Sequence, residues 1–97
     1  MKQTVAEKIF SRKAGFEVFA GDIITAEVDA CLTNDASGPL MIDYFRKMQA
    51  DRVAHPERVA AILDHYVPCP NSRVAALQQS LFDFRGQYGI RLVDAGE

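Results

Sequence analysis

The second half of the sequence has the pattern of two strands joined by a helix, and this pattern constrains the fold more than any other feature. Residues 59–63 are apolar at every position, as in a strand covered on both faces. Asn71 or Ser72 can cap the helix that follows, and Gly89 ends it. Ile90–Val93 is then a second strand, and such a unit favours parallel strands with a right-handed crossover. We therefore predict an α/β fold with a mainly parallel sheet.

The first half of the chain continues the alternation of helices and strands. Thr4 and Glu7 have the spacing of a capping box, which predicts that a helix begins there. Ile23–Val28 is rich in β-branched residues and predicts the first strand. A second helix is predicted near 38–49, with Ser37 as its N-cap. The side chains that this second helix is expected to bury are Leu40, Met41, Tyr44, Phe45 and Met48.

Length and composition exclude several classes of protein. Ninety-seven residues, 48% hydrophobic and 25% charged, describe one domain with one core. Such a chain has an expected radius of gyration of ~12.5 Å. Eleven basic and thirteen acidic residues provide no broad cationic surface for nucleic acid. No apolar stretch is long enough for a membrane span or a secretory signal, so we expect a cytoplasmic protein without nucleic-acid or membrane partners.

The two cysteines do not form a recognisable metal motif. Together with His55 and His65, Cys31 and Cys69 are the only soft metal ligands in the chain, and their spacing fits no known zinc pattern. Neither cysteine has a cationic motif nearby that would favour a thiolate. We expect no metal site, and we expect both cysteines to be buried as small apolar side chains.

Polar residues follow each of the three predicted strands. Asn34 and Asp35 come after the first strand, Asp64 and His65 after the second, and residues 94–97 after the third. In parallel sheets the groups that touch ligands collect beyond the carboxyl ends of the strands. These side chains are therefore expected at one edge of the sheet, and they are the main functional signal in the sequence.

The Asp64–His65 pair is the strongest candidate for chemistry. Histidine titrates near neutrality, and a neighbouring carboxylate can orient its ring for proton transfer. The alternative is that Asp64 caps a turn and His65 is a partly exposed loop residue. Residues 34–38 are open to two interpretations in the same way. They form either a binding loop for an anion before a helix N-terminus or only a turn and a cap.

Four motifs extend these observations over residues 4–97. In order, they are Thr4-Val-Ala-Glu-Lys-Ile-Phe10, Gly21-Asp-Ile-Ile24 with Val28-Asp29, Leu32-Thr-Asn-Asp-Ala-Ser-Gly-Pro39, and Ile62-Leu-Asp-His-Tyr-Val-Pro68. Together they resemble the beginning of the aconitase superfamily. The closer resemblance is to the large subunit of 3-isopropylmalate dehydratase and to homoaconitase-like enzymes. It implies that residues 1–97 are the amino-terminal portion of a larger aconitase-type α/β/α domain.

The resemblance also implies an activity and a set of site residues. The family consists of hydro-lyases that isomerise hydroxy-di- or tricarboxylic acids by dehydration and rehydration. Asp64 and His65 match the family's catalytic Asp-His pair by position. Asn34, Asp35 and Ser37 match positions that bind substrate, although Ser37 stands where threonine is common. Leucine biosynthesis is the first expectation, and lysine biosynthesis through homoaconitate and 2,3-dimethylmalate breakdown stay open.

The family's cofactor and partners follow from the same resemblance. Family members hold a [4Fe-4S] cluster with three cysteines from a downstream region, and Cys31 and Cys69 match none of them. The resemblance therefore implies a truncated chain that binds no cluster and is inactive alone. A small dehydratase subunit is the expected partner of the complete enzyme, and an uncovered sheet face would favour self-association. The alternatives are a non-catalytic α/β binding or interaction module and a free-standing phosphate or carboxylate binder at residues 34–38.

Overall fold

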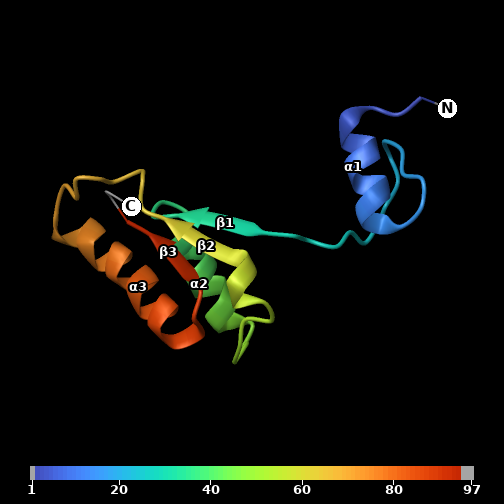
Figure 1. Cartoon of the computed structure of the whole chain (residues 1–97). Helices are drawn as coiled ribbons and strands as arrows, with labels where there is room; N and C mark the ends of the chain where they lie inside the picture. The colour runs from blue at the N-terminus through green and yellow to red at the C-terminus, as the bar shows by residue number, and fades with distance from the viewer. Residues whose placement is uncertain (1, 95–97) are drawn as a thin grey trace.

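The chain forms a small parallel sheet with helices on one face and an amino-terminal arm at one end (Figure 1). The computed structural model describes residues 2–94. Strands β1 (Cys31–Asn34), β2 (Val59–Ile62) and β3 (Arg91–Val93) lie in the order β1-β2-β3, and both pairings are parallel. The predicted α/β fold with a parallel sheet is confirmed.

Two helices connect the strands and cover the same face of the sheet. Helix α2 (Gly38–Lys47) leads from β1 through the short 3₁₀ helix η1 (Pro56–Arg58) to β2, and helix α3 (Ser72–Tyr88) leads from β2 to β3. Since the strand order follows the chain order, crossovers of the usual right hand place both helices on one side. Figure 1 shows this arrangement. The predicted caps of α3 are confirmed, because Asn71 accepts a hydrogen bond from the amide of Val74 and Gly89 adopts a left-handed φ of 76°.

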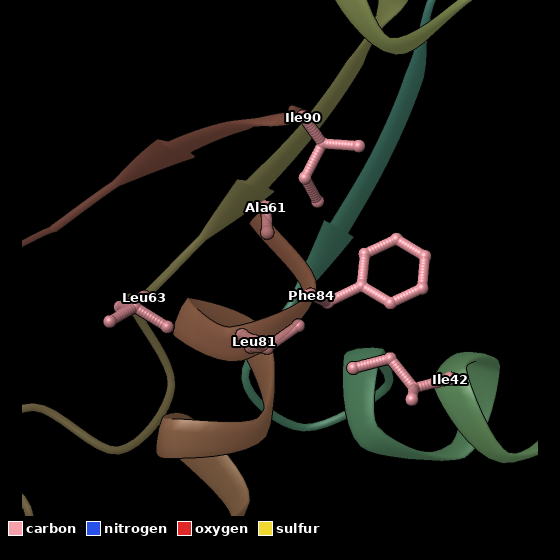
Figure 2. Packing of buried hydrophobic residues seen from close by; sticks show 6 residues of the cluster. All are labelled: Ile42, Ala61, Leu63, Leu81, Phe84 and Ile90. Carbon is pink, nitrogen blue, oxygen red and sulfur yellow. The ribbon is translucent and has the colours of Figure 1, made fainter. Parts of the chain in front are cut away.

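The core lies between this face of the sheet and the two helices (Figure 2). Leu81 and Phe84 of α3 and Ile42 of α2 pack against strand residues, and each is at most 2% exposed. Gly38 allows the two helices to approach, because a Cβ at this position would lie 2.6 Å from Cδ2 of Leu81. The six buried members of the cluster are Ile42, Ala61, Leu63, Leu81, Phe84 and Ile90.

Among residues 2–94, no helix covers the opposite face of the sheet. Side chains alternate between the faces of a strand, so Leu32 and Ala60, which are partners in the register, point away from the helices. Leu32 is 73% exposed. The uncovered sheet face expected from the sequence is therefore present in residues 2–94.

The amino-terminal arm is a helix tied to a following loop by polar contacts. Helix α1 (Val5–Ala14) begins with the predicted capping box of Thr4 and Glu7. The second carboxylate oxygen of Glu7 accepts the amide of Ala20 at 3.0 Å, and the Ser11 hydroxyl accepts the amide of Val18 at 2.8 Å. Hydrogen bonds to Glu7 therefore hold both the start of the helix and the returning loop, and they lower the pKa of its carboxyl from 4.5.

This arm lies apart from the sheet, and the expected compact shape is wrong. The molecule measures 54 × 29 × 22 Å, and its radius of gyration is 16.9 Å. The expected value was ~12.5 Å for a chain of this length. The physical reason is that α1 buries none of its residues, and its apolar side chains Val5, Ile9 and Phe10 are about half to three-quarters exposed. These side chains add nothing to the single core.

The predicted first strand is also wrong. Residues 22–28 form no strand, and β1 begins only at Cys31. Ile23 is fully exposed, so its β-branched side chain does not pack on any neighbour. Strand propensity depends on such packing, and it is the residues in register with β2 that pair.

Helix α2 buries a different side from the predicted one. Ile42 is its buried apolar residue, and Met41 and Phe45 are partly buried against the core as predicted. Leu40, Tyr44 and Met48 are between 58% and 73% exposed, so the prediction that they are buried is wrong. The apolar stripe of α2 is wider than the surface that the sheet and α3 offer.

Within residues 2–94, no helix is long and apolar enough to cross a membrane.

Candidate functional site

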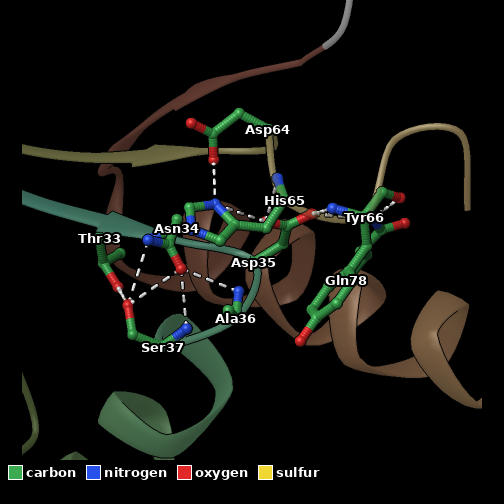
Figure 3. Close-up of polar contacts among 9 residues, drawn as sticks. All are labelled: Thr33, Asn34, Asp35, Ala36, Ser37, Asp64, His65, Tyr66 and Gln78. Carbon is green, nitrogen blue, oxygen red and sulfur yellow. Dashed lines mark hydrogen bonds and ion pairs between the residues drawn. The ribbon is translucent and has the colours of Figure 1, made fainter.

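The carboxyl ends of β1 and β2 bring the predicted site residues together (Figure 3). Asn34 is the last residue of β1 and is in register with Ile62, so the loops after both strands start side by side. Asp35 follows β1 directly, and Asp64 and His65 follow β2. Of the polar residues predicted to follow the third strand, 94–97, only Asp94 is among the described residues; 95–97 lie outside them.

Asp35 lies at the centre of this edge and is completely buried. Its Oδ1 atom accepts the amide of His65 at 3.0 Å, and its Oδ2 atom accepts the amide of Tyr66 at 2.9 Å. Gln78 of α3 donates its Nε2 amino group to the same Oδ2 atom at 3.2 Å. Burial raises the pKa of Asp35, but these hydrogen bonds to the ionised form outweigh it and leave the pKa below 3.8.

Gln78 belongs to this site and is missing from the sequence-based predictions. Its Nε2 amino group also donates to the carbonyl of Tyr66 at 3.1 Å, so it contacts both Asp35 and the loop after β2. One signal in the sequence could have revealed it. Gln78 lies four residues after Val74 and three before Leu81, within the apolar stripe of α3. A polar residue inside such a stripe indicates a buried polar partner.

The Asp64–His65 pair lies on the surface of this edge. The two side chains are 57% and 50% exposed, and 2.6 Å separates Asp64 Oδ1 from His65 Nδ1. An ionised carboxylate can only accept a hydrogen bond, so the neutral ring must carry its proton on Nδ1. Nε2 then has the free lone pair. His65 Nδ1 also lies 3.9 Å from Oδ1 of Asp35, so the ring has one exposed and one buried carboxylate on the same side.

Asn34 organises the turn between β1 and α2. Its Oδ1 atom accepts the amides of Ala36 and Ser37, both at 2.9 Å, and the Ser37 hydroxyl at 3.2 Å. None of these bonds uses the Nδ2 amino group of Asn34. Ser37 occupies the N-cap position but its hydroxyl makes no capping bond, since it contacts Thr33 and Asn34 instead. The prediction that Ser37 is the N-cap residue is confirmed, but its side chain does not cap the helix, because its hydroxyl bonds to Thr33 and Asn34.

Metal-ligating atoms meet at one place in the described part of the chain. Asp35, Asp64 and His65 each offer an atom within 4.8 Å of the others, but the oxygens of Asp35 already accept three internal hydrogen bonds. Neither Cys31 nor Cys69 belongs to such a group in residues 2–94, so these residues do not fit an iron–sulfur cluster, which needs several thiolates at one point. Both cysteines are exposed, and the prediction that they are buried is wrong.

Curated relatives match nearly the whole sequence. The 3-isopropylmalate dehydratase large subunit 1 of Thermotoga maritima is 37% identical over 97 residues, which is 100% of this chain. The probable large subunit of Methanothermobacter thermautotrophicus is 40% identical over 92 residues, and that of Aquifex aeolicus is 37% identical over 92 residues. The chain is a relative of the 3-isopropylmalate dehydratase large subunits. No protein-family model matches it.

The match covers only part of each of these relatives. The 3-isopropylmalate dehydratase large subunits of Thermotoga, Methanothermobacter and Aquifex are covered over 23%, 22% and 21% of their lengths. The chain thus spans about a fifth of the length of the relatives it matches.

Proposed function

We propose that the chain is the amino-terminal portion of a hydro-lyase large subunit that interconverts hydroxy acids by removing and adding water. The substrate class is that of 3-isopropylmalate, the acid in the names of the relatives. The observation on which this rests most is the Asp64–His65 pair at the carboxyl edge of the sheet, with Nε2 of His65 available for a proton.

The pair suits the proton transfer that dehydration requires. A hydroxyl group leaves as water only after it gains a proton, and an imidazolium at His65 can supply that proton from Nε2. Asp64 accepts a hydrogen bond from Nδ1, which helps to orient the ring. In the hydration direction, the neutral ring takes a proton from water at the same nitrogen.

The neighbouring turn suits the binding of a carboxylate substrate. The Nδ2 amino group of Asn34 can donate to a carboxylate oxygen, since the turn uses only Oδ1 of this side chain. Helix α2 begins directly beyond Ser37, and the partial positive charge of its N-terminus favours an anion there. Asn34 and Ser37 are therefore the proposed substrate-binding residues of this chain.

The remaining components of the activity belong to the complete enzyme. The described residues do not fit a [4Fe-4S] cluster, so the family's cluster would be held outside residues 2–94. We propose that the isolated chain has no hydratase turnover and that the complete enzyme pairs with a small subunit. A cytoplasmic location and a role in leucine biosynthesis stay predictions that follow from this proposed function.

Grafting the chain into a complete relative tests this function. Residues 1–97 would replace the matched segment of the Thermotoga maritima large subunit, and turnover of 3-isopropylmalate would be measured with the small subunit present. We expect turnover from the graft and none from the isolated chain. A graft that melts like the parent enzyme but has no turnover would support the non-catalytic interaction module instead.

The free-standing anion binder at residues 34–38 receives less support. The amides of Ala36 and Ser37, which would have to bind the anion, already donate to Oδ1 of Asn34. Titration with malate-type acids, followed through the amide resonances of 34–38, separates the two cases. Saturable shifts that persist after removal of the His65 ring would favour the binder.

A further inference from the structure

We propose that the buried carboxylate of Asp35 and the side chain of Gln78 form a clamp that orients the Asp64–His65 pair, so that Asp35 and Gln78 are positioning residues of the site. The proposal rests on the catalytic role assigned to that pair under the proposed function. It gives Asp35 a task different from the substrate contact that the family resemblance implies. It also adds Gln78, which neither the motifs nor the relatives' names indicate.

The first part of the clamp is the carboxylate of Asp35. With no exposed surface, it has no face on which a substrate could bind. Its two oxygens accept the consecutive amides of His65 and Tyr66, at 3.0 Å and 2.9 Å. Two bonds from one planar group to adjacent amides fix both the position and the direction of that backbone. A single hydrogen bond would still allow the loop to rotate.

The second part is the side-chain amide of Gln78. Its Nε2 group donates to Oδ2 of Asp35 and to the carbonyl of Tyr66, so it connects α3 to both other partners. A buried carboxylate is stable only when donors replace the water that it loses. Gln78 supplies such a donor and at the same time anchors the loop to a long helix. Three elements, β1, the loop after β2, and α3, therefore meet at this carboxylate.

The pair on the surface needs such support. Ion pairs between exposed side chains typically contribute little to stability, too little to hold one geometry. Asp64 and His65 are both about half exposed. The geometry of the pair therefore also depends on the backbone of His65, and the amide of that residue is one of the two that Asp35 fixes. Asp35 Oδ1 also lies 3.9 Å from Nδ1, on the side where the ring proton is expected.

Magnetic resonance on the full 97-residue chain can test the clamp without any turnover. The variants are Gln78→Met, which keeps the length of the side chain but cannot donate, and Gln79→Met as the matched control. Gln79 is the next residue on α3 and bonds to Asp83 on the exposed surface. The readouts are hydrogen exchange of the His65 and Tyr66 amides and the ring nitrogen signals of His65 at a pH where imidazole is neutral. His55, which is exposed, is the internal reference.

In the Gln78→Met variant, exchange of the two amides should accelerate about fivefold, the factor that corresponds to the roughly 1 kcal/mol that one hydrogen bond contributes. The His65 ring should change from the Nδ1-protonated form to a mixture of both forms, while the His55 signals stay the same. Gln79→Met should leave all these readouts at their wild-type values. Unchanged His65 ring signals in a folded Gln78→Met variant would overturn the proposal.

A measurement on the wild-type chain covers the case in which Gln78→Met does not fold. The His65 and Tyr66 amides should exchange slowly and resonate at the low-field positions of amides bonded to a carboxylate. Exchange as fast as that of exposed loop amides would also overturn the clamp. Since no readout depends on hydratase turnover, an inactive graft would refute the proposed function and leave this result standing.

Discussion

At the scale of single residues, the site has an inner and an outer group with different properties. Asp35 is buried and its carboxylate accepts three hydrogen bonds. Asp64 and His65 are about half exposed and contact each other. Stability is therefore concentrated in the inner group, and the proposed chemistry in the outer one. Changes to the two groups should have separable effects.

Replacement of Asp35 should lower stability in a pH-dependent way. The folded-state pKa of Asp35 lies below 3.8, so the ionised carboxylate stabilises the fold above that pH and the contribution is lost as the pH falls through the folded-state pKa. Asp35→Asn should reduce the free energy of unfolding by about 1–3 kcal/mol at neutral pH, because one amide loses its acceptor. Its stability should also vary less with pH below 3.8. Urea denaturation over a series of pH values measures both effects.

Asp43→Asn is the control for this substitution, since Asp43 is exposed on α2. It should change the free energy of unfolding by less than about 0.5 kcal/mol. Equal stability of Asp35→Asn and wild type at neutral pH would contradict the role given to the buried carboxylate.

The sequence indicates the outer group better than the inner one. Asp64 and His65 follow an apolar run directly, so their place at the edge of the sheet can be predicted from local pattern. Burial of Asp35 depends on how α3 packs against the sheet. Gln78, its partner on α3, is 43 positions from Asp35 in the chain. No local rule connects two residues so far apart. A polar residue in an apolar stripe is the one available clue.

At the scale of elements, helices are predicted well and the first strand is not. Caps and glycines define helix ends locally, and the capping box of α1 and the caps of α3 are confirmed. A strand forms only where a partner is available. Ile23–Val28 has the composition of a strand but no partner, whereas Cys31–Asn34 pairs with β2.

Two glycine substitutions should have opposite effects on the helices. Gly38→Ala would place a Cβ 2.6 Å from a methyl group of Leu81, which is fully buried and cannot move away freely. We expect a loss of roughly 1–3 kcal/mol in the free energy of unfolding, as for other overpacked cores. Gly86→Ala meets nothing within 4 Å and lies within α3. Gly86→Ala should raise the free energy of unfolding by about 0.5–1 kcal/mol, because alanine loses less conformational entropy than glycine when a helix forms. Urea denaturation of both variants gives the signs, and a stabilised Gly38→Ala would contradict the packing of α2 on α3.

Loss of the first capping box should affect α1 alone. Thr4→Ala removes the hydroxyl that accepts the Glu7 amide, which typically weakens a helix by ~1 kcal/mol. Amides of α1 should therefore exchange faster, while those of β2 and α3 keep their wild-type rates. Faster exchange throughout the sheet would contradict the separation of the arm from the core.

At the scale of the whole molecule, the main feature is the apolar surface that the described residues leave exposed. The arm exposes Val5, Ile9 and Phe10, and the free face of the sheet exposes Leu32. A hollow of about 400 Å³ also lies along the edge strand β1, between Cys31 and Phe84. Sheets of α/β proteins are usually covered on both faces, so these surfaces are suited to contact with further protein.

The isolated chain should therefore self-associate. In sedimentation, the wild-type chain should form larger species as concentration rises, and Leu32→Lys should shift the equilibrium towards monomer by placing a charge on the free sheet face. Leu40→Lys is the matched control, because Leu40 is also exposed but lies on α2. A wild-type chain that stays monomeric at high concentration would contradict this prediction.

The most direct test of the central claim is the turnover of the Thermotoga graft with His65 replaced by alanine. His65→Ala should reduce turnover of 3-isopropylmalate at least about 100-fold, the usual contribution of a general acid or base. His55→Ala, which alters an exposed histidine next to η1, should leave turnover unchanged. Full turnover by His65→Ala would contradict the assignment of this edge of the sheet as part of a hydro-lyase active site.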